Sequence, residues 1–530
     1  MRTWWQGAVL YQIYPRSFAD TNGDGVGDLP GITEKLDYVA ALGVDGIWLS
    51  PFFASPMKDF GYDVSDYREV APVFGTLDDF RHLLERAHGL GLKVVIDQVY
   101  SHSSDRHPWF EESRSSRDNP KADWYVWADP KPDGMPPNNW LSIFGGVAWT
   151  WEPRRGQYYL HNFLKEQPDL NLHTPAVQEA ILDVAAFWMD LGVDGFRLDV
   201  ANLYMHDPLL RDNPPRHNPR PKKAYHLQQP FYNRSRPENM AFIARLRALM
   251  DRYPERMTVA EIASDTPIQT MVAYTAGPDR LHTAYSFVFL AEPYSAGHFR
   301  RSVEAMEAAS EQAWPSWAFS NHDVVRVVSR WGGGQTSPAQ ARMLMALLVS
   351  LRGTVFLYQG EELGLPEADI PFERLQDPEG ITFWPLHKGR DGCRTPMPWR
   401  DQAPNGGFST GEPWLPVAPA HLPLAVERQE ADPESTLSFT RRLLHWRQEQ
   451  GVLVKGTIRF LDLPEPVLGF LREGEGGRML CLFNLGGGSA TVDLPIPEGI
   501  TPVRISGLAA EVSGTRVHLP AFGGLFATIP

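Results

Sequence analysis

Several short apolar segments of this chain end in an acidic residue, a pattern that suggests acid–base or nucleophilic chemistry. The four acids are Asp97 after VVI, Asp199 after GFRL, Glu261 after TVA and Asp323 after SWAFSNH. A single acid in such a place is usually a helix cap or a solvated loop charge. Carboxylates that converge repel one another, so a cluster of four is costly and folding alone does not require it. We expect a site that uses their charges or protons.

The spacing of Arg197 and Asp199 indicates how one of these acids is kept ionised. Residues two apart on a strand face the same side, so the guanidinium lies beside the carboxylate. An opposite charge at ~4–6 Å lowers a carboxylate pKa by roughly 1–3 units. Asp199 would then stay charged, as a nucleophile must. The spacing alone fits a structural ion pair equally well.

Glu261 follows the apolar residues Val259 and Ala260. A carboxyl group near apolar walls and other carboxylates has a raised pKa, which suits a general acid. One ionised and one protonated carboxyl group together are the apparatus of glycoside hydrolysis. His102 and His322 would donate hydrogen bonds to sugar hydroxyls, although either alone is more often a structural histidine.

A repeated pattern of helix, Leu-Gly and short apolar strand positions these residues. It occurs at LGVDGIWLSP from Leu42, LGLKVVIDQV from Leu90 and LGVDGFRLDV from Leu191. Further strands are predicted at 8–14, 257–262, 316–321 and 353–358. Helices that alternate with buried strands give parallel βα units. The number of units and the chain length favour a (β/α)₈ TIM barrel over an open sheet.

Two segments break this rhythm and divide the chain. Residues 103–173 are rich in Pro, Trp, Asp and Gly and follow the third barrel strand, where barrels accept insertions on their active face. We predict a small inserted domain there. From about residue 455, short strands spaced by Gly and Pro predict a C-terminal all-β domain, a β-sandwich over 455–530. The barrel then consists of residues 1–102 and 174–454.

The composition excludes several classes of partner. The formal net charge is −14 without a basic run, so nucleic acid and anionic membranes are poor partners. No apolar run is long enough to span a membrane. The two cysteines lie far apart, and the N-terminal residues lack the pattern of a signal peptide. We expect a cytoplasmic monomer or homodimer that acts on a small molecule.

Taken together, the motifs resemble those of the α-amylase family of glycoside hydrolases, and the resemblance covers nearly the whole chain. The motifs in the family's order are DQVYSH (97–102), GFRLDV (195–200), AEI (260–262) and FSNHD (319–323). Three more resemble the oligo-1,6-glucosidase and α-glucosidase branch: QPDLN (167–171), YQGEELG (358–364) and RTPMPW (394–399). Any one could arise by chance, but the ordered set is highly specific.

The resemblance implies roles for particular residues. Asp199 would be the nucleophile, Glu261 the general acid/base, and Asp323 the acid that holds two sugar hydroxyls. The substrate-binding residues would be Tyr62, Asp63, His102, Phe163, Arg197, Val200, His322 and Arg326. Valine at the position of Val200 tends to accompany α-1,6 cleavage in this branch, whereas threonine or alanine accompanies α-1,4 cleavage. Ser101 replaces the family's usual asparagine, which argues against a calcium ion between barrel and insert.

The loop DTNGDGVGD is a separate candidate for a metal site. Its alternate oxygen ligands, Asp20, Asn22, Asp24, the Val26 carbonyl and Asp28, suit a hard cation such as Ca²⁺ or Mg²⁺. The loop is not an EF-hand, because its twelfth position is a glycine and no helix precedes it. A Gly/Asp-rich turn without metal is the alternative. The matching loop of related α-glucosidases binds an ion, so we expect one structural divalent cation and no organic cofactor.

The predicted function is that of a retaining, exo-acting α-glucosidase on short maltose- or isomaltose-type substrates, with transglucosylation. An alternative is a glucosyltransferase or isomerase on the same scaffold, such as a trehalose synthase or sucrose isomerase, because these share every catalytic residue. A catalytically inactive relative, like the heavy chains of amino-acid transporters, is disfavoured. Those proteins have a membrane span and lose catalytic acids, whereas this chain retains all three.

Overall fold

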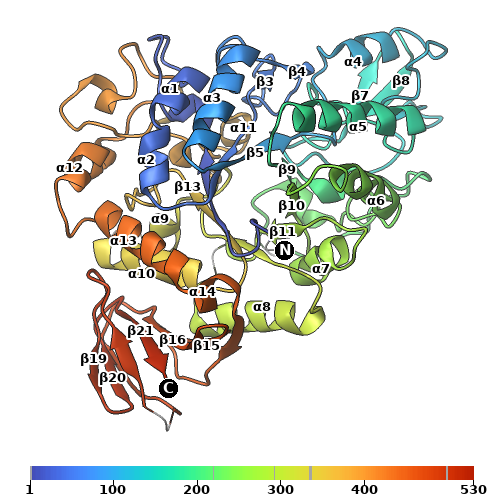
Figure 1. The fold of residues 1–530 in the computed structure, drawn as a ribbon. Coiled ribbons are helices and arrows are strands. Elements are labelled where there is room, and N and C mark those ends of the chain that lie inside the picture. The colour runs from blue at the N-terminus through green and yellow to red at the C-terminus, as the bar shows by residue number, and fades with distance from the viewer. Residues whose placement is uncertain (1–2, 219, 292, 334–336, 497–498) are drawn as a thin grey trace.

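The computed structural model describes residues 3–218, 220–291, 293–333, 337–496 and 499–530. Within them, eight parallel strands form one sheet (Figure 1): β1 (Val9–Ile13), β2 (Gly46–Leu49), β5 (Lys93–Gln98), β9 (Gly195–Leu198), β10 (Met257–Ile262), β11 (Thr283–Ser286), β12 (Ser316–Ala318) and β13 (Thr354–Tyr358). Their order is β11-β10-β9-β5-β2-β1-β13-β12, and a parallel bridge between Ala284 and Pro315 joins the two edges. The predicted TIM barrel is confirmed.

The strand predictions differ from the structure mainly at their ends. β10 has the predicted bounds, while β1 is one residue shorter at each end and β12 ends at Ala318. β11 was not predicted from the sequence: it has only four residues, TAYS, with a polar residue at each end. Such a segment lacks the apolar run by which the other strands were recognised.

Helices cover the outside of the barrel. They are α1 (Leu29–Glu34), α2 (Leu36–Ala41), α3 (Leu77–Gly89), α5 (Pro175–Asp190), α6 (Asn239–Met250), α7 (Pro267–Thr275), α8 (Ala296–Ala309), α9 (Val327–Trp331) and α10 (Pro338–Ser350). Thr76 and Asp79 form the capping box at the start of α3, as their spacing predicts. Thr174 precedes α5 as predicted but does not cap it, because its hydroxyl donates to the Asp123 carbonyl of the insert.

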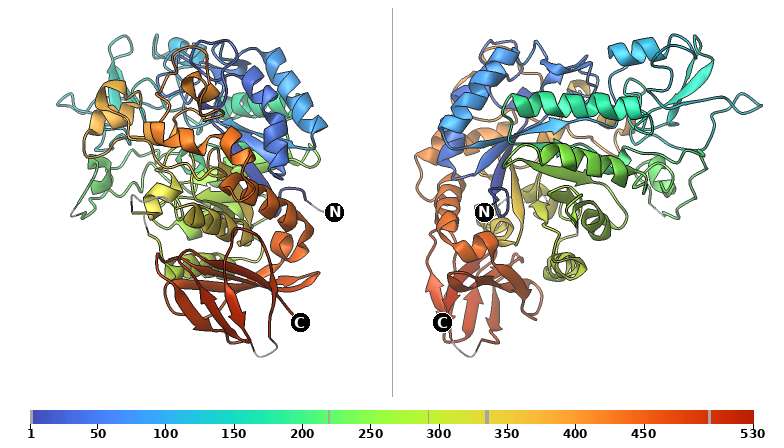
Figure 2. Two further views of the ribbon diagram at one scale, coloured as in Figure 1. Left: turned by 90° about the vertical axis from the view of Figure 1, so that its left-hand side faces the viewer. Right: turned by 45° about the vertical axis from the view of Figure 1, so that its right-hand side comes forward.

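The segment after β5 projects from one side of the barrel in Figure 2. It contains α4 (Pro108–Ser113) and an antiparallel sheet of β6 (Trp127–Ala128), β8 (Gln157–Leu160) and β7 (Trp149–Glu152). A two-stranded ribbon, β3 (Phe53–Ala54) with β4 (Asp66–Val70), follows β2. These loops all follow barrel strands and therefore lie on the carboxyl face of the barrel.

The C-terminal part packs below the barrel in Figure 1. The segment after β13 contains α11 (Pro378–Phe383) and α12 (Val426–Glu430), and α13 (Thr436–Glu449) and α14 (Gly451–Lys455) then lead into the C-terminal sheets. One antiparallel sheet contains β14 (Thr457–Phe460), β15 (Val467–Gly474), β16 (Gly477–Asn484), β21 (Gly524–Ile529) and β18 (Thr501–Val503). A second contains β17 (Ala490–Asp493), β20 (Arg516–Leu519) and β19 (Glu511–Ser513). The predicted all-β character is confirmed.

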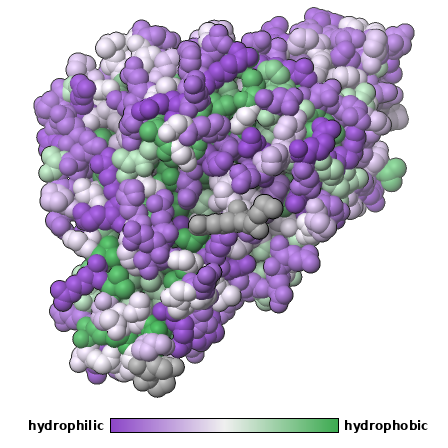
Figure 3. All heavy atoms as spheres, in the orientation of Figure 1, coloured by the Kyte–Doolittle hydropathy of each residue, from purple (hydrophilic) through white to green (hydrophobic). Residues whose placement is uncertain are grey.

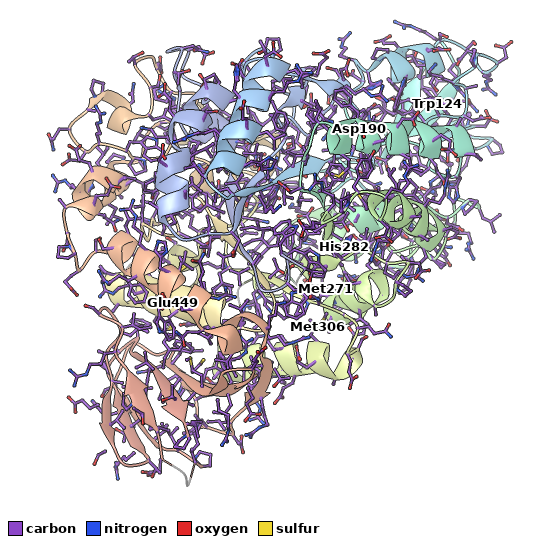
Figure 4. The ribbon with its side chains drawn as sticks, in the orientation of Figure 1. Trp124, Asp190, Met271, His282, Met306 and Glu449 are labelled. Carbon is purple, nitrogen blue, oxygen red and sulfur yellow. The ribbon has the colours of Figure 1, made fainter. Side chains whose placement is uncertain are left out.

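Two apolar layers hold the barrel together. Inside it, aromatic and branched side chains such as Trp48, Val259 and Phe356 form one cluster. Outside it, α7 and α8 bury residues such as Met271 and Met306, which Figure 4 labels. The face in Figure 3 is mostly hydrophilic, with apolar residues in small groups. No helix of the described residues is both long and apolar enough to cross a membrane.

Candidate active site

A cavity of about 390 Å³ opens at the carboxyl ends of the barrel strands. Asp199, Glu261 and Asp323 all line it, although they come from three different strand ends. The other lining residues are Asp59, Tyr62, His102, Ile143, Phe144, Phe163, Val200, Leu203, Lys223, Tyr225, His226, Arg234, Ala263, Phe287, Glu379, His387 and Arg390. The convergence of acids predicted from the strand ends is therefore present.

The Arg197 guanidinium lies among three carboxyl groups. Its Nη1 is 2.7 Å from Asp97 Oδ1 and 2.8 Å from Asp199 Oδ1. Its Nη2 is 2.7 Å from Glu261 Oε2. The side chain is fully buried. The alternation of side chains along β9 thus places Arg197 beside Asp199, as predicted. The neighbouring strands β5 and β10 contribute Asp97 and Glu261.

Burial raises the pKa of Asp199 and of Glu261, and Arg197 opposes the rise at both. Burial likewise raises the pKa of Asp97 to about 6 against the same arginine. Arg197 does lower the pKa of Asp199, as expected. The net pKa is nevertheless raised, because burial and the neighbouring carboxyl groups outweigh the arginine. One guanidinium balances only part of their charge, so the site favours a bound proton, as a general acid requires.

Asp323 has a different environment. Arg394 Nη2 donates to its Oδ1 at 3.0 Å, and Arg390 Nη1 lies 3.4 Å from the same atom. Burial opposes ionisation, yet His322 and the two arginines hold the pKa of Asp323 well below its usual range. Burial also lowers the pKa of His322, so that ring is neutral, and we attribute the stabilised charge of Asp323 to the arginines.

Three further predicted residues form one aromatic wall of the cavity. His102 packs on Phe163 at 5.3 Å between ring centroids, and Tyr62 stacks on His322 at 5.4 Å. The Tyr62 hydroxyl donates to Asp97 Oδ2 at 3.1 Å. Burial lowers the pKa of His102 to about 4, so this ring is neutral near pH 7. His322 touches Tyr62 and Asp323 but is not itself exposed to the cavity.

Val200 lines the cavity in an unusual backbone conformation. Its φ and ψ are 37° and 47°, in the left-handed region that disfavours β-branched side chains. This strained turn aims the Val200 N–H at Glu261 Oε2, at 3.2 Å. Val200, which follows Asp199, therefore contacts Glu261 through its backbone and the cavity through its side chain.

The structure corrects the predicted roles of Asp63 and Arg326. Asp63 accepts hydrogen bonds from the backbone of Lys58 and Asp59 and from Ser55 Oγ, so it holds the loop and does not line the cavity. Arg326 donates to the carbonyls of Gln359 and Cys393, away from the cavity. The spacing within a loop does not fix which side chain faces a site, because loops lack the regular alternation of a strand.

Five residues at the site were not predicted from the sequence: Asp59, Arg390, Arg394, Lys223 and Tyr285. Arg390 Nη2 donates to Asp59 Oδ1 at 2.8 Å, so these two occupy the place expected for Asp63 and Arg326. The sequence does carry a signal for the two arginines, since Arg394 is the first residue of RTPMPW and Arg390 lies in KGRDGC, which directly precedes that motif. Lys223, in the Pro-rich segment, has no such hint.

The loop of the predicted metal ligands is ordered by its own backbone. Asp20 accepts hydrogen bonds from the N–H groups of Gly23 and Gly25, and Asn22 and Asp24 each accept one from two residues on. Asp28 caps α1 through Gly31 N. Within the described residues, no three His, Cys, Asp or Glu side chains converge closely enough to hold a metal ion. The oxygen atoms of the loop suit a hard cation, but its acidic side chains do not converge on one point.

Paired carboxyl groups at the carboxyl face of a parallel barrel are an arrangement that glycoside hydrolases use. This chain belongs to the α-amylase family, because the model of the α-amylase catalytic domain matches residues 12–456.

Individual proteins resemble the chain over nearly its full length. It is 54% identical over 538 residues to a probable α-glucosidase of Rhizobium meliloti (strain 1021), covering 100% of this chain and 97% of that protein. It is 40% identical over 534 residues to an oligo-1,6-glucosidase of Heyndrickxia coagulans, covering 93% and 94%. The solved structure of the α-glucosyl transfer enzyme XgtA matches with a TM-score of 0.98 and 56% identity, over 100% of both chains.

Proposed function

We propose that this chain is a retaining, exo-acting α-glucosidase that releases α-glucose from the non-reducing end of short α-glucosides. The observation that supports this most is the contact of Asp199 and Glu261 with one guanidinium at the cavity wall. A shared arginine keeps the two carboxyl groups close. Retaining glycosidases need them ~5–5.5 Å apart, too close for a water molecule to attack between them.

The reaction would proceed in two displacements. Asp199 attacks the anomeric carbon while Glu261 gives its proton to the leaving oxygen, so one C–O bond forms as another breaks. Glu261, now a carboxylate, then removes a proton from water or from a sugar hydroxyl, whose oxygen attacks the same carbon and releases Asp199. Two inversions give net retention. Asp323, kept ionised by its arginines, would accept hydrogen bonds from the hydroxyls of the bound glucose.

The arginine network supports exo action. Arg390 donates to Asp59 and to Asp377, each at 2.8 Å, and its guanidinium lies 4.8 Å from the centre of the Phe144 ring. These groups join the insert to the segment after β13 across the cavity wall. Such a wall suits a pocket for a terminal sugar rather than an open groove for a polymer.

A second candidate is glucosyl transfer as the main outcome. The observation that favours it is the 56% identity to an α-glucosyl transfer enzyme over the whole chain. Both reactions share the glycosyl-enzyme and differ only in what accepts the glucose. The α-1,4 or α-1,6 preference is likewise a property of the acceptor side of the cavity.

One product assay tests both candidates. The purified protein is incubated with maltose, isomaltose, sucrose and trehalose, and early products are followed by proton NMR. We expect α-glucose as the first free anomer, followed by transfer products at high substrate concentration. β-Glucose as the first anomer would contradict the retaining mechanism. Trehalose formed from maltose, or isomers formed from sucrose without free glucose, would identify an isomerase.

We further propose one structural divalent cation, Ca²⁺ or Mg²⁺, in loop 20–28, and a cytoplasmic monomer or homodimer. The alternating oxygen donors of the loop support the first. Light scattering of the purified protein tests the oligomeric state.

A further inference from the structure

Tyr285 on β11 lies inside the barrel directly behind the acid/base residue. Its side chain is 1% exposed, and its ring packs against Trp48 and Phe356, at 6.2 and 5.9 Å between ring centroids. This packing fixes the ring, so its hydroxyl has a defined position. The hydroxyl lies between Arg197 and Glu261.

The donors of Arg197 determine which way the Tyr285 hydroxyl must act. Arg197 Nε and Nη2 lie 3.2 and 3.1 Å from the hydroxyl oxygen, and a guanidinium can only donate. The oxygen has two lone pairs, and both are used by these contacts. Its single proton is left for Glu261 Oε1, at 3.3 Å. Tyr285 therefore donates to the carboxyl group.

Among the residues that the structure describes, the groups that form hydrogen bonds or ion pairs with the Glu261 carboxyl are all donors. Oε2 faces Arg197 Nη2 at 2.7 Å and Val200 N–H at 3.2 Å, and Oε1 faces Tyr285. When Glu261 is protonated, its proton cannot point at any of these donors. The three donors leave one lone-pair position free, on Oε1. That position is available to the acid proton, and Glu261 itself lines the cavity.

We propose that Tyr285 is a positioning residue for Glu261, whose carboxyl it holds from behind so that the acid proton faces the glycosidic oxygen. This inference rests on the glycosidase function proposed above. Arg197 and the strained turn at Val200 hold Oε2, but Tyr285 alone among the described residues holds Oε1. Its removal lets the carboxyl rotate and misdirects the proton.

The same contact has a consequence for the pH profile. The charged or titratable groups near Glu261 are Arg197, Asp97, Asp199, Asp323 and Tyr285. Burial raises the pKa of Glu261, while the Tyr285 hydrogen bond stabilises the carboxylate and lowers it. Losing the hydroxyl therefore raises the pKa of the general acid, which must be protonated for the first step.

The test compares Tyr285→Phe with Tyr100→Phe. Both substitutions remove one hydroxyl from a fully buried ring, but the Tyr100 hydroxyl has no hydrogen-bond partner among the described residues. We expect Tyr285→Phe to lose about tenfold more kcat/KM on maltose than on nitrophenyl α-glucoside, whose leaving group needs little protonation. The basic limb of its kcat/KM profile should move to higher pH. Tyr100→Phe should change neither.

Other outcomes are distinguishable. Equal losses on both substrates with an unmoved basic limb would mean that Tyr285 only supports the fold, and the proposal would be overturned. The same selective loss in Tyr100→Phe would overturn it as well. A folded wild-type protein inactive on both glucosides would reject the proposed function, and this inference with it.

Discussion

At the scale of single residues, Asp199 and Glu261 share Arg197 yet have different surroundings. Glu261 receives donors at both oxygens, whereas Asp199 receives Arg197 at Oδ1 and is exposed to the cavity. A carboxylate whose free oxygen faces a substrate suits the nucleophile, and a carboxyl group held from behind suits the acid/base.

We expect Asp199→Asn to abolish turnover and keep the fold. An amide has the shape of the carboxylate but cannot form the glycosyl ester. Steady-state hydrolysis of maltose and thermal unfolding check the two parts. Asp183→Asn, at an exposed position of α5, is the control and should be as active as the wild type. Hydrolysis near the wild-type rate by Asp199→Asn would remove the residue from this role.

Asp59 and Asp63 lie four residues apart and should respond differently to the same change. Asp59→Asn removes the charged partner of Arg390 in the cavity wall. A hydrogen bond to a charged group contributes ~1.5–3 kcal/mol, so kcat/KM should fall about tenfold or more. Asp63→Asn places an amide against backbone donors and should lower the free energy of unfolding by ~1–3 kcal/mol. Steady-state kinetics and thermal unfolding of both variants show which of the two acids affects kcat/KM and which affects stability. The opposite pattern would restore Asp63 as the substrate-binding residue.

Val200→Thr tests the choice of linkage with little disturbance of the backbone. Both side chains are β-branched, so the strain at φ 37° is unchanged, and only a methyl group becomes a hydroxyl. We expect the maltose-to-isomaltose ratio of kcat/KM to shift towards maltose by an amount within ~1–3 kcal/mol. Leu203→Met, also in the cavity wall, should leave the ratio alone. An unchanged ratio in Val200→Thr would assign the linkage to the Pro-rich loop instead.

At the scale of elements, loop 20–28 joins the start of the barrel to a segment near its end. Asp20 N donates to the Phe408 carbonyl, Ser409 Oγ donates to Asp20 Oδ2, and Trp414 N donates to the Gly25 carbonyl. A side chain at position 25 would collide with the Glu412 carbonyl, so glycine permits this contact. Whatever stabilises the loop therefore stabilises this junction.

If loop 20–28 binds a divalent cation, removing the ion should lower thermal stability more than the intrinsic catalytic rate. A ligand that binds only the folded state stabilises that state, and the loop contains none of the acids proposed for catalysis. Metal analysis after purification without chelator should find one equivalent, and EDTA should lower the Tm. Asp24→Ala should weaken this response, whereas Asp66→Ala, at an exposed residue outside the loop, should not. A metal-free protein would show that the loop is held by its backbone hydrogen bonds alone.

At the scale of the whole molecule, two buried arginines attach the C-terminal part to the barrel. Arg472 of β15 donates to the carbonyl of Ser350, and Arg447 of α13 donates to that of Val349, each at 2.6 Å. Both carbonyls lie at the end of α10, where helical carbonyls lack intrahelical partners and the dipole favours cations. Burial lowers the pKa of Arg472 to about 9 and that of Arg447 to about 10.

Arg472→Met should lower the free energy of unfolding by at least ~1–3 kcal/mol, the cost of one buried acceptor left unpaired. Arg472 also donates to the Gly456 and Thr457 carbonyls, so the loss extends along the junction. The kcat/KM of folded protein should not change, because Arg472 is not a cavity residue. Arg459→Met, at an exposed arginine of β14, is the control for thermal unfolding. Equal stability of the two variants would show that apolar packing holds the parts together.

Local periodicity and the order of the motifs were enough to predict several features of this protein. Strand alternation placed Arg197 beside Asp199, and the repeated βα units predicted the barrel and the convergence of acids at its carboxyl face. The capping residues of α3 followed from their spacing. These features need only the geometry of one element, or a rule that all parallel barrels obey.

Features that depend on contacts between distant segments emerge only in the folded chain. The loop that contains Asp59 and Asp63 turns irregularly, because positive φ values occur at Met57, Phe60 and Gly61. Sequence spacing therefore does not show which of the two acids faces the cavity. The pKa of Asp199 depends on its burial and on carboxyl groups from other strands. Neither can be deduced from the sequence of β9 alone. Tyr285 lies on a strand too short and too polar to recognise, and its role exists because β11 pairs with β10 beside Glu261.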